Sequence, residues 1–129
     1  MNIEKTSFGG LLLHTSHGNF AVNAGGSMED MEAGFRVREQ PLHGLILTSE
    51  HIHRSRNAAA FANRFGIPVL ISTATWEVLG EHFDRPVLFS PPGTVDFEGL
   101  TVEFLFHPVD VTFLFSYYKI ITIVLVIDD

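Results

Sequence analysis

The sequence contains no cysteine and few basic residues. Eight lysines and arginines stand against fifteen aspartates and glutamates, so the net charge is −7 with the histidines neutral. The missing thiols exclude disulfide scaffolds, thiolate metal sites and cysteine nucleophiles. The acidic balance argues against a broad nucleic-acid surface, because such a surface needs clustered positive charge. The chain does have seven histidines, so metal sites built from histidine and carboxylate are the first candidates.

Charged residues and long apolar runs are also scarce. Only 18% of the residues are charged and 46% are hydrophobic, which excludes an intrinsically disordered chain. A length of 129 residues is usual for one domain. His107, Asp110 and Lys119 interrupt the apolar C-terminal region, so no stretch reaches the ~20 residues of a membrane span. Residues 1–5 have no signal-peptide pattern, so we expect a cytoplasmic protein.

Helix and strand patterns alternate and then give way to strands alone, which predicts an α/β fold with two to three helices. One helix is expected from an N-cap at Ser27 to about Glu39. A second is expected from an N-cap at Ser55 to the C-terminal glycine Gly66, and a short third over residues 73–80. Strands are expected at 11–13 and 19–22, which form a hairpin, and at 45–48, 69–71, 87–89, 101–106, 111–118 and 120–127.

The segment most informative about chemistry is residues 45–56, which reads Leu-Ile-Leu-Thr-Ser-Glu-His-Ile-His-Arg-Ser-Arg. Histidines in the loop after a buried strand lie at the sheet edge where α/β proteins bind ligands. Here the sequence resembles the metallo-β-lactamase fold superfamily of metal-dependent hydrolases. The resemblance is nearest to its WalJ-like exonuclease branch and to the phosphodiesterase branch of carbon–phosphorus lyase pathways.

The family motif Thr-His-x-His-x-Asp-His aligns without gaps from Thr48. His51 keeps the second histidine, whereas Ser49 replaces the first, His53 replaces the aspartate and Arg54 replaces the last histidine. The likeness continues ungapped through the expected helix and residues 66–69 and 75–77, which fixes this register. A shifted register would match His51 and His53 to the first two histidines, but it needs an insertion.

Three further landmarks resemble the family. Asn23 stands for the aspartate of a strand-ending Asp-Ala-Gly, and residues 96–102 lead to His107 as the passage before the third-motif histidine does. Asp128 or Asp129 resembles the carboxylate that bridges two metal ions. The match covers about the first half of the family's αββα sandwich. We therefore expect residues 1–129 to form a single metallo-β-lactamase-like domain that lacks the C-terminal half.

The substitutions in the motif reduce the set of metal ligands that the resemblance implies. The first ion keeps His51 and His107 with Ser49 as a poor third ligand, and the second has His53 and Asp128. A guanidinium has no lone pair to donate, and a unit charge ~4 Å from a divalent ion repels it by roughly 8 kcal/mol at an effective dielectric of ~20. We expect at best one weak site for zinc or manganese. The function implied is that of a phosphodiester or ester hydrolase whose metal site is eroded and weak or inactive.

Other readings of these residues stay open. His51 and His107 are equally consistent with structural histidines, and Asp128 with a solvated terminus. Arg54 and Arg56 flank Ser55 at an expected helix N-terminus, which favours anions. The same half-fold would then be a non-catalytic interaction or anion-binding module. A half-fold also exposes an apolar sheet face, which predicts a homodimer or a missing partner segment. No membrane partner is expected, and charge does not support nucleic acid.

Overall fold

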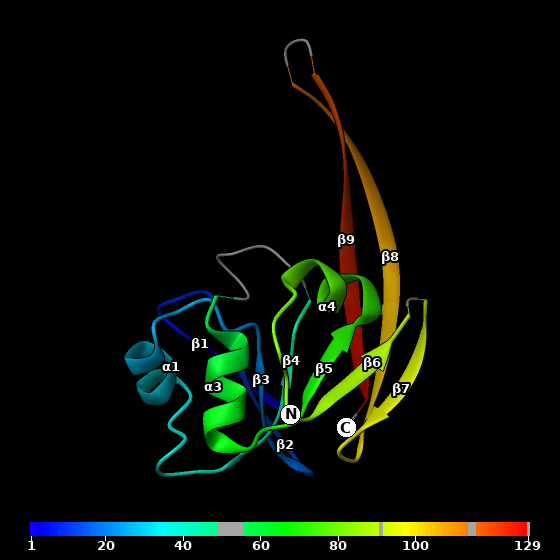
Figure 1. Ribbon diagram of the computed structural model, residues 1–129. Helices are drawn as coiled ribbons and strands as arrows, with labels where there is room; N and C mark the ends of the chain where they lie inside the picture. The colour runs from blue at the N-terminus through cyan, green and yellow to red at the C-terminus, as the bar shows by residue number, and fades with distance from the viewer. Residues whose placement is uncertain (49–55, 91, 114–115, 129) are drawn as a thin grey trace.

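Two β-sheets and three helices make up the described part of the chain (Figure 1). The computed structural model describes residues 1–48, 56–90, 92–113 and 116–128, with the backbone alone at 104–113, 116–126 and 128. The larger sheet has the order β1-β2-β3-β4-β5-β6 and the smaller β7-β8-β9. The strands of the larger sheet are β1 Asn2–Lys5, β2 Leu11–Thr15, β3 Gly18–Val22, β4 Leu42–Ile46, β5 Val69–Ser72 and β6 Pro86–Phe89.

The larger sheet is mixed. Strands β1, β2 and β3 pair antiparallel, which confirms the expected hairpin, and β3, β4, β5 and β6 pair parallel. Strand β1 was not predicted, because all four of its residues are exposed. An edge strand of this kind pairs through its backbone, so it lacks the apolar alternation that marks a half-buried strand.

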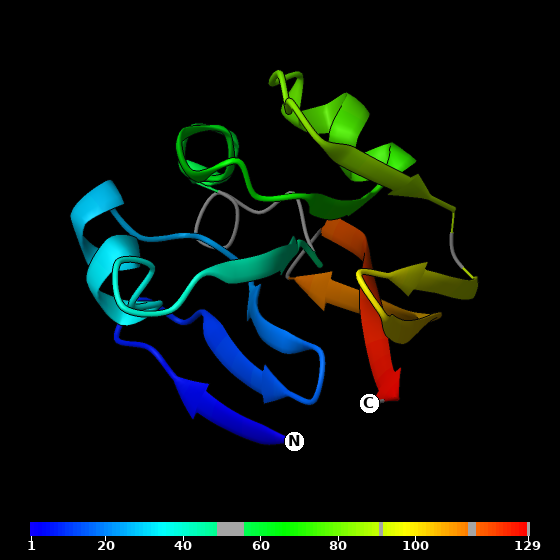
Figure 2. The same cartoon turned by 90° about the horizontal axis from the view of Figure 1, so that it is seen from below.

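Helices α1 (Met28–Gly34), α3 (Ala58–Phe65) and α4 (Thr73–Leu79) cover one face of the larger sheet, and the smaller sheet lies against the other (Figure 2). Neighbouring residues of a strand therefore enter different cores: Leu45 packs on the helix side, and Ile46 on the side of the smaller sheet. A strand that is buried on both faces has a continuous apolar sequence, and this feature allowed these strands to be predicted. None of the described helices is long and apolar enough to cross a membrane.

Two helix boundaries differ from expectation. The Ser27 hydroxyl accepts from the Asp30 N–H at 3.1 Å, which confirms the N-cap, but α1 ends at Gly34 rather than near Glu39. The chain leaves the helical conformation at Arg36, whose φ is 51°. Helix α3 begins at Ala58 with Asn57 in the N-cap position, so the predicted start after Ser55 was too early. Its predicted end is confirmed, since Gly66 closes the helix with a φ of 65°.

The C-terminal strands were also predicted incorrectly. Instead of strands at 101–106, 111–118 and 120–127, the structure has two long strands, β8 (Leu100–Phe113) and β9 (Ser116–Asp128). They pair antiparallel along their whole length, so the chain reverses inside the predicted 111–118 strand. The apolar and aromatic composition of this region has no glycine or asparagine to mark the turn. Strand β7 (Gly93–Phe97), which precedes them, was not predicted.

The two sheets meet closely at Gly44 of β4. A side chain at this position would collide with the Phe97 ring of β7, so the missing Cβ lets the smaller sheet approach. Phe97 is 1% exposed, and it packs with Phe20 at a ring distance of 5.9 Å. The larger sheet thus has helices on one face and a second sheet on the other.

Candidate functional site

The predicted site residues fall into two groups. Ser49, His51, His53, Arg54 and Ser55 lie outside the described residues. Arg56, His107 and Asp128 are described at least in their backbone. Arg56 is exposed and lies two residues before α3.

The backbone register separates two of the predicted metal ligands. His107 of β8 lies opposite Thr122, and Asp128 of β9 lies opposite Thr101. The two positions are therefore six ladder steps apart, roughly 20 Å at ~3.3 Å per residue. An imidazole and a carboxylate bound to the same metal ion cannot bridge this distance between their backbones. In this ladder the structure does not bring His107 and Asp128 to one metal ion.

Asn23, directly after β3, ties this strand end to the end of β4. Its N–H donates to the Ile46 carbonyl at 2.9 Å. Its side-chain Oδ1 accepts from the Thr48 N–H at 3.1 Å and from the Thr48 hydroxyl at 3.0 Å. The φ of Asn23 is 64°, in the left-handed region that asparagine tolerates better than most residues. Thr48, the last described residue before the candidate loop, is thus held by two hydrogen bonds to the side chain of Asn23.

Asn57 fixes the chain on the far side of that loop. Its Nδ2 donates to the Gly26 carbonyl at 3.2 Å, and its φ is 62°. Both ends of segment 48–57 are therefore attached to the same stretch, residues 23–26. Sequence reasoning missed Asn57. A weak signal was present, since an asparagine just before a helical pattern is a frequent site of left-handed backbone, but the partner lies 31 residues away.

A charged cluster joins the edge strand β1 to the rest of the domain. The Glu4 carboxylate accepts from Arg36 Nη2 at 3.0 Å and lies 3.0 Å from His14 Nε2. The hydrogen bond from Arg36, followed by that from His14, holds the pKa of Glu4 below its ordinary value of 4.5. The cluster links β1, β2 and the turn after α1, so its role is structural.

The donor set decides what metal the chain fits. Within the described residues, no group of three or more His, Asp or Glu side chains is placed to hold an ion. The remaining donors are His51, His53 and His107, with a serine and an arginine at two positions of the family motif. Three imidazoles suit one catalytic-type ion with an open position, and a second ion lacks ligands. By the chemistry of its donors alone, this set would suit one metal ion rather than two.

No protein-family model and no curated protein matches the chain. Solved structures do. MEM-A1, a subclass B3 metallo-β-lactamase isolated from a soil metagenome library, is 14% identical with a TM-score of 0.60 over 88% of this chain and 55% of its own. GOB-18 from Elizabethkingia meningoseptica is 14% identical with a TM-score of 0.58, over 88% of this chain and 53% of its own. A β-lactamase from Chitinophaga pinensis is 17% identical with a TM-score of 0.58, over 88% and 54%.

The chain therefore has the metallo-β-lactamase fold, as the motif resemblance predicted. It spans about half the length of these structures. Sequence identities of this size establish the fold, whereas the activity has to be argued from the chain's own residues.

Proposed function

We propose that this protein is a hydrolase-like member of the metallo-β-lactamase fold whose metal site is eroded, so that it binds one zinc or manganese ion weakly. Its nearest functional relatives would be metal-dependent phosphodiester and ester hydrolases. The observation that supports this proposal most is the Asn23–Thr48 tie, at 3.0 and 3.1 Å. It holds the entry to the histidine-bearing segment at the carboxyl ends of two parallel strands, β3 and β4.

The proposed ligands are His51, His53 and His107. When bound, such an ion lowers the pKa of a coordinated water and polarises a substrate oxygen. Arg54 cannot replace a ligand, because guanidinium stays protonated. Asp128 is left out of this ligand set because its backbone is six ladder steps from that of His107.

Metal content tests the proposal. We expect purification without a chelator to give up to one zinc or manganese per chain, and His51→Ala to lose it. His43→Ala, at an exposed histidine of β4, is the matched control and should keep the metal. Asp128→Asn should also keep it. Absence of metal, together with no hydrolysis of bis-p-nitrophenyl phosphate, would remove the enzyme proposal.

The second candidate is an anion-binding module without metal. It is supported by the start of α3, where Asn57 makes no side-chain cap bond and Arg56 is exposed one residue earlier. Uncapped N–H groups at a helix start favour an anion. Binding of inorganic phosphate to the metal-free protein, lost in Arg54→Gln/Arg56→Gln, would establish this candidate in place of the first.

A further inference from the structure

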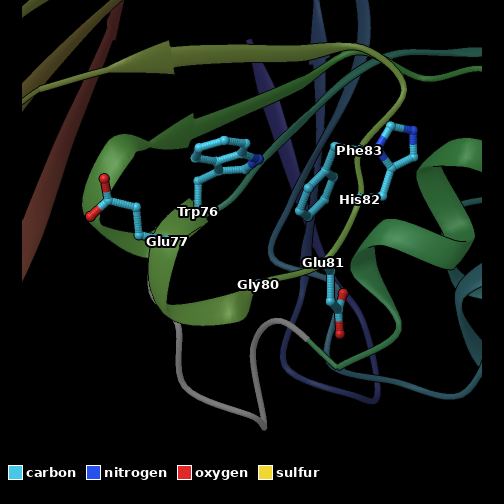
Figure 3. A pocket seen from close by; sticks show the side chains of 6 residues that line it. All are labelled: Trp76, Glu77, Gly80, Glu81, His82 and Phe83. Atoms are coloured by element: carbon cyan, nitrogen blue, oxygen red, sulfur yellow. The ribbon is translucent and has the colours of Figure 1, made fainter.

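The chain's single tryptophan lines a cavity at the end of α4. The cavity has a volume of about 380 Å³, within the range of small-ligand sites. It is lined by Trp76, Glu77, Gly80, Glu81, His82 and Phe83. Figure 3 shows the Trp76 and Phe83 rings beside each other, with Glu77 and Glu81 extending from different sides.

The aromatic part of the cavity is half open. Phe83 is 3% exposed and forms part of the packed core, whereas Trp76 is 37% exposed. A partly exposed indole is accessible to a ligand, and tryptophan is the best side chain for binding an organic cation through its ring face. The space beside Gly80 is open, because a Cβ added at this residue would meet no atom within 4 Å.

The charges around the cavity are unusual for a helix end. The C-terminus of a helix carries a partial negative charge and usually attracts lysine, arginine or histidine. The last turn of α4 has no basic residue; Glu77 lies in that turn, and Glu81 follows the C-cap Gly80. Each like charge at this end destabilises the helix slightly, and a bound cation would relieve that repulsion.

The neighbouring basic side chains are engaged elsewhere. Arg85 donates through Nη1 to the Gly66 carbonyl at 2.7 Å, at the end of α3. His82 Nε2 lies 2.9 Å from the Asp84 carboxylate. Neither contact reaches Glu77 or Glu81, so the cavity keeps a net negative character among the described residues.

We propose that this cavity binds an organic cation on an apolar stem, that is, the alkylammonium or guanidinium group of a lysine or arginine side chain or of a free amine. The stem packs against Trp76 and Phe83, and the cation lies near the carbonyl end of α4, where Glu77 and Glu81 make the surroundings negative. This site is independent of the proposed metal chemistry.

Tryptophan fluorescence tests the proposal directly, because Trp76 is the only tryptophan. Agmatine, as the free amine, and a blocked tripeptide with a central arginine are each titrated into the full chain. The tripeptide with citrulline in place of arginine is the uncharged control. We expect saturable binding of the charged ligands in the millimolar range and at least several-fold weaker binding of the citrulline peptide. Tighter binding of the arginine peptide than of agmatine would assign the site to a polypeptide partner, and the reverse to a free amine.

Variants locate the site. Glu77→Gln/Glu81→Gln should weaken agmatine binding roughly five- to twenty-fold, as expected for two exposed carboxylates. Glu103→Gln, at an exposed glutamate of β8, should leave it unchanged. The double variant should be no less stable than the wild type, because it removes negative charge from a helix C-terminus. Unchanged affinity in the double variant, or no binding by fluorescence and by ligand-observed NMR at tens of millimolar agmatine, would overturn the proposal.

Discussion

Asn23 is predicted to stabilise the domain by two separable effects. Its Oδ1 accepts from the N–H and hydroxyl of Thr48, and its backbone has a φ of 64°. Each hydrogen bond contributes about 1 kcal/mol. A left-handed backbone costs an alanine roughly 1 kcal/mol more than a residue that tolerates it. Asn23→Ala loses all of these contributions and should lower the free energy of unfolding by about 3 kcal/mol.

Two further substitutions at the same position separate the effects. Asn23→Gly keeps the backbone freedom and loses only the acceptor, so it should cost about 2 kcal/mol. Asn23→Asp keeps both the acceptor and the tolerance of this backbone, so it should stay within about 0.5 kcal/mol of the wild type above the aspartate pKa. Urea denaturation followed by far-UV circular dichroism measures all three, with the slope checked for constancy.

Asn63 in α3 provides the matched control. Its side chain also makes two hydrogen bonds, donating to the His82 carbonyl at 2.8 Å and accepting from the Asp84 N–H at 2.9 Å. Its backbone is helical, and glycine costs ~1 kcal/mol more than alanine in a helix. Glycine should therefore be the better substitute at Asn23 and the worse one at Asn63. The reasoning is refuted if the order is the same at both positions, or if Asn23→Gly is as stable as the wild type.

Three other predictions concern the packing between the sheets, the charge on Glu4 and the oligomeric state. Gly44→Ala should destabilise the domain by about 1–3 kcal/mol, because the new methyl group collides with Phe97 between the sheets, and urea denaturation measures the loss. The lowered pKa of Glu4 means that its contribution to stability is present above pH 4.5 and is lost as the pH falls through the lower folded value; Arg36→Gln should raise the Glu4 pKa measured by NMR titration. The chain is expected to form a homodimer or to bind a partner segment, and a monodisperse monomer in light scattering at low concentration would contradict this.

Much of the layered core could be predicted from the sequence, because its strands are buried on both faces. Leu70 packs on the side of the smaller sheet and Ile71 on the side of the helices, so the run from Val69 is continuously apolar. The edge strand β1 and the reversal between β8 and β9 could not be predicted. β1 has no buried residue, and residues 111–118, within which the chain reverses, contain no glycine, proline or asparagine to mark the reversal.

The candidate site was predictable only as a segment. The motif after Thr48 identified residues 49–56 through resemblance, and these assignments stay predictions because most of the segment lies outside the described residues. The contacts that hold the segment depend on pairs far apart in sequence. Asn23 meets Thr48 across 25 positions, and Asn57 meets Gly26 across 31. No local pattern encodes such pairs.

The residues that position the candidate segment, such as Asn23, differ from the residues that would bind a metal ion. Both bonds to Thr48 need an acceptor and a left-handed backbone, and neither needs a negative charge. An amide therefore suffices for these bonds at the position where the resemblance has an aspartate. The ligand positions are different, because a serine and an arginine at Ser49 and Arg54 cannot replace imidazoles at a metal ion. The fold can thus keep the entry to the segment in place while residues at the ligand positions change, which is why similarity of fold at 14–17% identity does not carry activity with it.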